Sequence, residues 1–226
     1  MVEEILGLFI SPVTTAKKRA EEKNIKKEAI IALVLAVIIG LTTILSLYIG
    51  VVKSVNSVYK SLKDYNDKYS WSEITKEEFK EKKKEYKKDL LDSIEFAETF
   101  FKTTGIALLA ICIIAGMLYV ISRLVKSPLD FISVLSISNS SFMIYVVGML
   151  INLIFSFIYA PIGILIQAIA FVYAIITLAN TFKDSMEISD INKLVQYSTI
   201  VIGVLIIALY LIAKSYISSL LGSSLF

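Results

Sequence analysis

The fold is decided by the stretch from Phe131 to Phe182, which reads FISVLSISNSSFMIYVVGMLINLIFSFIYAPIGILIQAIAFVYAIITLANTF. These 52 residues include no charged side chain. A membrane core about 30 Å thick takes about 20 helical residues to cross, so the stretch is long enough for two crossings. Proline removes a backbone donor and clashes with the preceding helical turn, which places the break at Pro161. We therefore predict a helical hairpin with a tight turn at Pro161.

The remaining apolar residues extend this hairpin into a larger membrane domain. Hydrophobic residues make up 56% of the 226 residues, whereas soluble domains contain roughly 45–50% on a similar count. Three further uncharged runs predict an all-α, polytopic membrane protein with five transmembrane helices in a domain covering residues 29–226. The spans are expected at about 29–52, 103–125, 134–158, 162–182 and 194–214.

The first 28 residues are predicted to form a cytosolic segment that is amphipathic and basic. Serine is a good N-cap and proline suits the first helical position, so Ser11 and Pro12 should begin a helix. The apolar residues before Pro12 are expected to lie in the lipid interface, with Leu8 facing lipid and nearby lysines toward anionic headgroups. A solvated, charged helix leading into the first span is the alternative.

Residues 53–102 form the only sizeable polar segment, with twelve lysines and eleven acidic residues. Apolar residues recur at helical spacing on both sides of Trp71, and Thr75 begins a capping-box pattern. We predict a helical stalk between spans one and two, outside the membrane, with its tip near Trp71. Each of its two helices is expected to continue the adjoining membrane helix.

Four amide side chains in the central hairpin lie almost symmetrically about residue 160, namely Asn139, Asn152, Gln167 and Asn180. At about 1.5 Å per residue, Asn152 and Gln167 should lie at nearly the same depth. Asn139 and Asn180 should share a depth near the cytosolic edge. Hydrocarbon cannot satisfy an amide, so we predict that Asn152 or Gln167 bonds across the hairpin or to another span. A backbone carbonyl or a trapped water is the alternative partner.

Two absences exclude most intramembrane enzymes. The chain contains no histidine, which rhomboid-type serine proteases need as a base and zinc proteases need as a ligand. The predicted spans contain no carboxylate, which excludes intramembrane aspartyl proteases and argues against a lone ion-coupled transporter. We therefore predict a non-enzymatic protein without catalytic residues, cofactor or metal site, and the weak net charge of +3 does not suggest nucleic acid.

Lysine and arginine residues near the span ends predict the orientation. Their distribution favours a cytoplasmic N-terminus, with the stalk and the C-terminus outside the cell membrane. The lysines of the stalk count against this assignment, although acidic residues balance them.

Two segments of the chain share a pattern of a serine cap followed by a proline. One is Leu8-Phe-Ile-Ser11-Pro12, and the other is Ser127-Pro128-Leu-Asp-Phe-Ile-Ser-Val-Leu-Ser-Ile before the third span. Together with the five spans and the short-turned hairpin, these segments resemble the Yip family of Ypt/Rab-interacting membrane proteins, in particular its prokaryotic members. The lysine-rich stalk departs from the compact eukaryotic form.

The resemblance implies a polytopic, non-enzymatic protein. Eukaryotic relatives bind Rab GTPases and help organise transport vesicles, whereas a prokaryotic relative is expected to be an accessory or adaptor protein. The expected partners are the lipid bilayer and a membrane protein, for which an ABC-type transporter is one option, and self-association into a homo-oligomer is another. A permease-like subunit powered by a separate ATPase, or protection against membrane-active peptides, are the alternative functions.

Overall fold

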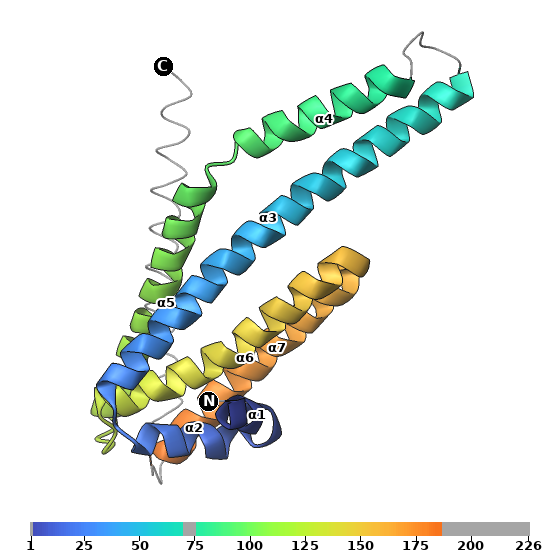
Figure 1. Ribbon diagram of the computed structural model, residues 1–226. Coiled ribbons are helices and arrows are strands. Elements are labelled where there is room, and N and C mark those ends of the chain that lie inside the picture. The colour runs from blue at the N-terminus through green and yellow to red at the C-terminus, as the bar shows by residue number, and fades with distance from the viewer. Residues whose placement is uncertain (1, 70–75, 187–226) are drawn as a thin grey trace, which may run out of the picture. The chain divides into compact units, whose positions relative to one another are not determined.

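A computed structural model describes residues 2–69 and 76–186 of the chain (Figure 1). The described residues form the helices α1 (Val2–Ile10), α2 (Pro12–Glu21), α3 (Ile25–Tyr69), α4 (Lys76–Asp92), α5 (Phe96–Leu124), α6 (Phe131–Ile158) and α7 (Ala160–Ser185). Four of these, α3, α5, α6 and α7, are long and apolar enough to cross a membrane. The all-helical class is confirmed. Trp71, Thr75 and the fifth predicted span at 194–214 lie outside the described residues.

The chain divides into two compact units, and each is described by itself. Of the described residues, the terminal unit contains 2–25, 112–138 and 177–186. The hairpin unit contains Lys26–Ile111 and Asn139–Ile176. The terminal unit therefore holds α1 and α2, and the hairpin unit holds the described part of the stalk and the turn between α6 and α7.

The central turn is present close to its predicted place. α6 ends at Ile158, Tyr159 is not helical, and α7 begins at Ala160 with Pro161 in its first turn. Proline suits this position because the backbone donor that it lacks would be unpaired there in any case. In the hairpin unit, α6 and α7 run antiparallel and side by side (Figure 1). Lys53 of α3 donates a hydrogen bond to the carbonyl of Ser156, and a cation is favourable at that end of α6.

The stalk agrees with the prediction on one side only. α3 is continuous from the first span to Tyr69, as expected. The prediction that the second stalk helix runs unbroken into the next span is wrong, because α4 ends at Asp92 and α5 begins at Phe96. Ser93 Oγ donates to the carbonyl of Leu90 at 2.8 Å, which is the acceptor that a continuing helix would use at Ile94. The backbone N–H of Ile94 bonds to Leu91 instead.

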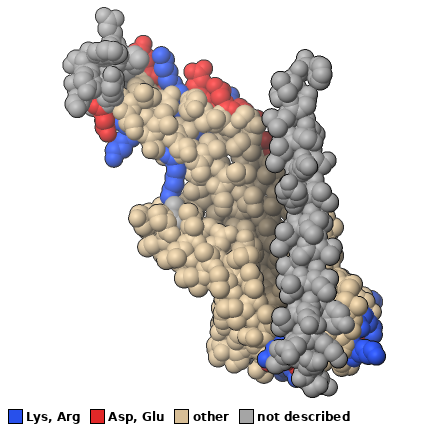
Figure 2. All heavy atoms as spheres, turned by 180° about the vertical axis from the view of Figure 1, so that it is seen from behind, with Lys and Arg blue, Asp and Glu red and all other residues tan. Residues whose placement is uncertain are grey.

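Aromatic contacts hold α4 against α3. The ring of Tyr59 lies 5.2 Å from that of Phe79 and 6.2 Å from that of Tyr86, measured between centroids. The ammonium of Lys87 lies 5.7 Å from the centre of the Tyr48 ring. Figure 2 shows basic and acidic side chains gathered along the stalk that α4 and the end of α3 form. Its charge fits a position outside the bilayer.

Candidate functional site

The helices α1 and α2 pack on each other in the terminal unit. Leu8 is completely buried, whereas Leu6 and Ile10 are 56% and 81% exposed and Phe9 is also exposed. The expectation that Leu8 faces lipid is therefore wrong. α1 is apolar on most of its circumference, so one side can pack against protein while another stays exposed. The exposed apolar side chains are Leu6, Phe9 and Ile10.

Ser11 stands at the N-cap position of α2, and Pro12 begins the helix as predicted. The predicted serine cap is absent, however, since the Ser11 side chain makes no capping hydrogen bond. Its backbone carbonyl accepts from the N–H of Thr15 at 3.0 Å, and its own N–H donates to the carbonyl of Gly7. The backbone of Ser11 thus joins the two helices.

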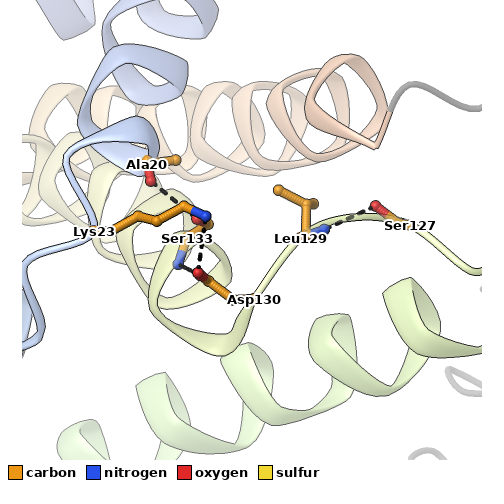
Figure 3. A network of polar contacts seen from close by, with 6 residues as sticks. All are labelled: Ala20, Lys23, Ser127, Leu129, Asp130 and Ser133. Carbon is orange, nitrogen blue, oxygen red and sulfur yellow. Dashed lines mark hydrogen bonds and ion pairs between the residues drawn. The ribbon is translucent and has the colours of Figure 1, made fainter.

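The end of α2 is fixed by two polar contacts with the segment that begins α6 (Figure 3). Ser133 Oγ donates to the carbonyl of Ala20 at 2.9 Å, which satisfies one of the carbonyls left open at the end of a helix. Lys23 follows in the left-handed conformation, with φ of 48°, and its ammonium lies 3.2 Å from the Asp130 carboxylate. These two contacts hold the N-terminal helices at the start of a membrane span.

The cap of α6 is three residues later than predicted. Asp130 Oδ1 accepts from the backbone N–H of Ser133 at 2.8 Å, so Asp130 is the N-cap and the helix begins at Phe131. Ser127 serves to end α5 instead. Its N–H bonds to the carbonyl of Ser122 at 2.8 Å, with Lys126 in the left-handed conformation, which is a Schellman motif.

Ser127 and Pro128 therefore form the connection between α5 and α6 and do not start a helix. The side chain of Ser127 accepts a hydrogen bond from the N–H of Leu129 at 3.3 Å. The backbone N–H of Ser127 is used in closing α5, and Asp130 caps α6 three residues later. Ser127 is buried, whereas Pro128 is exposed.

The electrostatics of Asp130 favour its charged form. Burial raises the pKa of Asp130, but hydrogen bonds from Ser133 and the nearby Lys23 ammonium more than offset this, so the pKa lies below its ordinary value of 3.8. A carboxyl group with a lowered pKa stabilises the fold above its ordinary pKa, and this stabilisation is lost as the pH falls toward the lowered value.

We expect Asp130→Asn to destabilise the protein by at most about 1 kcal/mol at pH 7, because asparagine keeps the cap and removes only a half-exposed ion pair. The difference from wild type should shrink below about pH 4 and vanish once Asp130 itself is protonated. Unfolding in detergent, followed by circular dichroism between pH 7 and pH 3, measures this difference. Asp89→Asn, on the exposed side of α4, is the control. A difference that persists unchanged at pH 3 would contradict the assignment.

The hairpin unit contains the amide contact that the sequence predicted. Asn152 Nδ2 donates to Gln167 Oε1 across the hairpin, and Gln167 Nε2 donates to the hydroxyl of Tyr145 at 3.1 Å. Gly163 permits the close approach, since a β-carbon there would lie 2.3 Å from Asn152 Oδ1. Pro161 brings the two amides to the same depth by setting the turn.

A double-mutant cycle on Asn152→Leu and Gln167→Leu should give a coupling energy of about 0.6 kcal/mol, the average for such bonds in membrane proteins. Unfolding in detergent measures the four stabilities. Asn180→Leu replaces Gln167→Leu in the control cycle, because Asn180 is exposed on α7 and should not couple to Asn152. Strictly additive effects of the first pair would show that the contact contributes nothing.

The second amide pair at equal depth does not meet. Asn139 is buried, and its Nδ2 donates to the carboxylate of Glu28 at 2.7 Å and to the carbonyl of Glu28 at 2.9 Å. Asn180 is exposed. Sequence reasoning thus missed Glu28 as well as Lys23, Asp130 and Ser133. Asp130 and Ser133 have the spacing of an N-cap and its partner, and that signal was readable.

Within residues 2–69 and 76–186, no group of three or more histidine, cysteine, aspartate or glutamate residues is close enough to hold a metal ion. The polar contacts described above join helices to one another. Exposed large apolar side chains of the terminal unit include Leu6, Phe9 and Ile10 of α1 and Ile113, Val120 and Leu124 of α5.

One comparison with known proteins identifies relatives. The model of a family described as the Yip1 domain matches residues 6–212 of the chain, which is most of its length. The match includes the second half of α1, all of α2 and the four helices that are long and apolar enough to cross a membrane. No curated protein and no solved structure matches the chain.

Proposed function

The chain belongs to the Yip1 domain family, and we propose that it acts as a membrane-organising accessory or adaptor protein for another membrane protein. It is an integral, multi-pass membrane protein, with four helices among the described residues that are long and apolar enough to span a membrane. The uncharged spans and the lack of histidine support a non-enzymatic role. An ABC-type transporter is the kind of partner that we propose first.

The observation that carries this proposal is the fixed position of α1 and α2. Hydrogen bonding between Ser133 and Ala20 and the ion pair of Lys23 with Asp130 anchor them. Leu6, Phe9 and Ile10 nevertheless remain exposed. Contiguous exposed apolar side chains mark interaction sites. A surface that is already ordered binds with a smaller loss of conformational entropy than a disordered tail would.

We further propose that α1 and α2 lie on the cytoplasmic side of the cell membrane, with the stalk outside. The lysine and arginine counts near the span ends support this orientation. A cysteine introduced at Ser72 in a Cys112→Ser background should then react with an impermeant thiol reagent on intact cells. Labelling only after lysis would show that the stalk lies on the cytoplasmic side and that the proposed orientation is wrong.

The adaptor role can be tested with a photo-crosslinking residue at Ile10 in the full-length protein, expressed in cells. We expect a membrane protein to be captured there, and to be absent when the crosslinker replaces the buried Leu8. The captured protein should also pull down this chain in a reciprocal purification. Lys23→Ala should reduce the capture, because Lys23 forms the ion pair with Asp130. Lys18→Ala should leave the capture unchanged, because Lys18 is exposed. Capture of lipid alone at Ile10 would overturn the proposal.

A further inference from the structure

A cavity of about 230 Å³ lies in the terminal unit between the end of α2, the segment before α6 and the end of α7. One water occupies about 30 Å³ of liquid, so the cavity has room for roughly eight waters and suits a small polar group better than a single ion. Its lining includes Lys17, Glu21, Lys23, Leu129, Ser133 and Ser185.

The cavity offers hydrogen-bond donors for a phosphate. Lys17 and Lys23 contribute ammonium groups. Ser185 is 9% exposed, and its hydroxyl has no hydrogen-bond partner among residues 2–69 and 76–186. A buried hydroxyl without a partner is unfavourable, and a ligand oxygen would satisfy it. The hydroxyl of Ser133 is already used, because it donates to Ala20.

The charges around the cavity argue against a simple anion. Glu21 supplies a carboxylate to the lining, and Lys23 is paired with the carboxylate of Asp130, which lies beside the lining residue Leu129 in the chain. Two ammonium groups and two carboxylates therefore balance. A ligand that carries both a phosphate and an ammonium group matches this arrangement. A primary ammonium can donate a hydrogen bond to Glu21, whereas the trimethylammonium of choline has no N–H to donate.

The cavity also lies where lipid headgroups are found. α6 begins at Phe131 and α7 ends at Ser185, and both helices are long enough to span the membrane. The ends of spanning helices lie at the headgroup level of the bilayer. We propose that this cavity binds the phosphoethanolamine headgroup of a phospholipid. Lys17 and Ser185 hold the phosphate, and Glu21 holds the ammonium.

The test uses the full-length protein in nanodiscs that contain equal amounts of phosphatidylethanolamine, phosphatidylcholine and phosphatidylglycerol. Native mass spectrometry of the released protein measures which lipid is retained. We expect retention of phosphatidylethanolamine over the other two. Lys17→Ala should weaken it roughly tenfold, as expected for the loss of a hydrogen bond to a charged group. Lys18→Ala is the control, because Lys18 is exposed and does not line the cavity.

Two further variants separate recognition from folding. Ser185→Ala removes one hydroxyl, leaves the charges in place and should weaken retention roughly threefold. Glu21→Gln removes the negative charge opposite the ammonium while keeping an oxygen that can accept a hydrogen bond, and it should shift the preference toward phosphatidylglycerol. Circular dichroism of each variant shows whether the helices are intact. Equal retention of the three lipids by wild type, or equal losses in Lys17→Ala and Lys18→Ala, would overturn the proposal.

A soluble competitor distinguishes the two sources of this headgroup. Phosphoethanolamine added to the delipidated protein should bind much more weakly than the lipid, since it lacks the acyl chains. Equal affinity for both would assign the cavity to the free compound and overturn the lipid source. None of these results depends on a protein captured at Ile10, so the adaptor role and the lipid site can fail separately.

Discussion

Gly148→Leu is expected to destabilise the hairpin of α6 and α7 by about 3 kcal/mol, at the upper end of the usual cost of overpacking. A β-carbon built on Gly148 would lie 2.2 Å from the β-carbon of Ala170, which is far closer than two carbons can approach. Alanine has no side-chain torsion by which it could move away. The two helices would have to separate, and the contact between Asn152 and Gln167 would be strained with them.

Unfolding in detergent measures the loss, and two variants make the result specific. Gly105→Ala on α5 is the matched control, because a β-carbon there has nothing within 4 Å. It should be neutral or should stabilise by up to about 1 kcal/mol through helix propensity. The exchange Gly148→Ala with Ala170→Gly should recover most of the stability that Gly148→Ala loses alone. Failure of this exchange, or a neutral Gly148→Leu, would show that the helices do not meet at Gly148.

The hairpin could be predicted because its signals are local and strong. A long run without charge has to cross the membrane twice, and Pro161 is the one residue near its middle that interrupts a helix. The same turn fixes the register of the two helices. Equal distances from it place Asn152 and Gln167 at the same depth, and their side chains also face each other across the hairpin.

Helix ends were less predictable, because neighbouring groups compete for the same backbone partners. A serine followed by proline fits a helix start, yet the N–H of Ser127 is used in closing α5 and Asp130 caps α6 instead. At the end of the second stalk helix, Ser93 Oγ bonds to the carbonyl of Leu90 and the N–H of Ile94 bonds to Leu91. These outcomes depend on which of two local hydrogen bonds forms, and residue type alone does not decide it.

The docking of α1 and α2 could not be predicted, because apolar periodicity does not reveal what covers each side of a helix. Leu8 and Ile10 are both aliphatic, but the first is buried against protein and the second is exposed. The contacts of Ser133 with Ala20 and of Lys23 with Asp130 join residues more than one hundred positions apart. Only the tertiary structure brings such residues together.

Asn139→Leu is expected to destabilise the protein by about 3 kcal/mol, although leucine has the same branched skeleton and suits an apolar helix. Asn139 Nδ2 donates to the Glu28 carboxylate at 2.7 Å, and Glu28 is only 2% exposed. Removing the donor of a hydrogen bond to a buried charged group costs about 1–3 kcal/mol or more, because the buried group cannot replace the lost bond with one to water. The backbone carbonyl of Glu28 loses the same donor.

The matched control for this substitution is Asn180→Leu, which changes the amide predicted to lie at the same depth. Asn180 is exposed, so its replacement should alter stability by less than about 0.5 kcal/mol. In a Glu28→Gln background, Asn139→Leu should cost about half as much, because a neutral amide is cheaper to leave without this donor. Equal effects at Asn139 and Asn180 would show that depth alone governs these positions. A large effect only at Asn139 would show that the direction of the side chain around the helix sets the cost of the substitution. The two positions share a depth, but only Asn139 contacts Glu28.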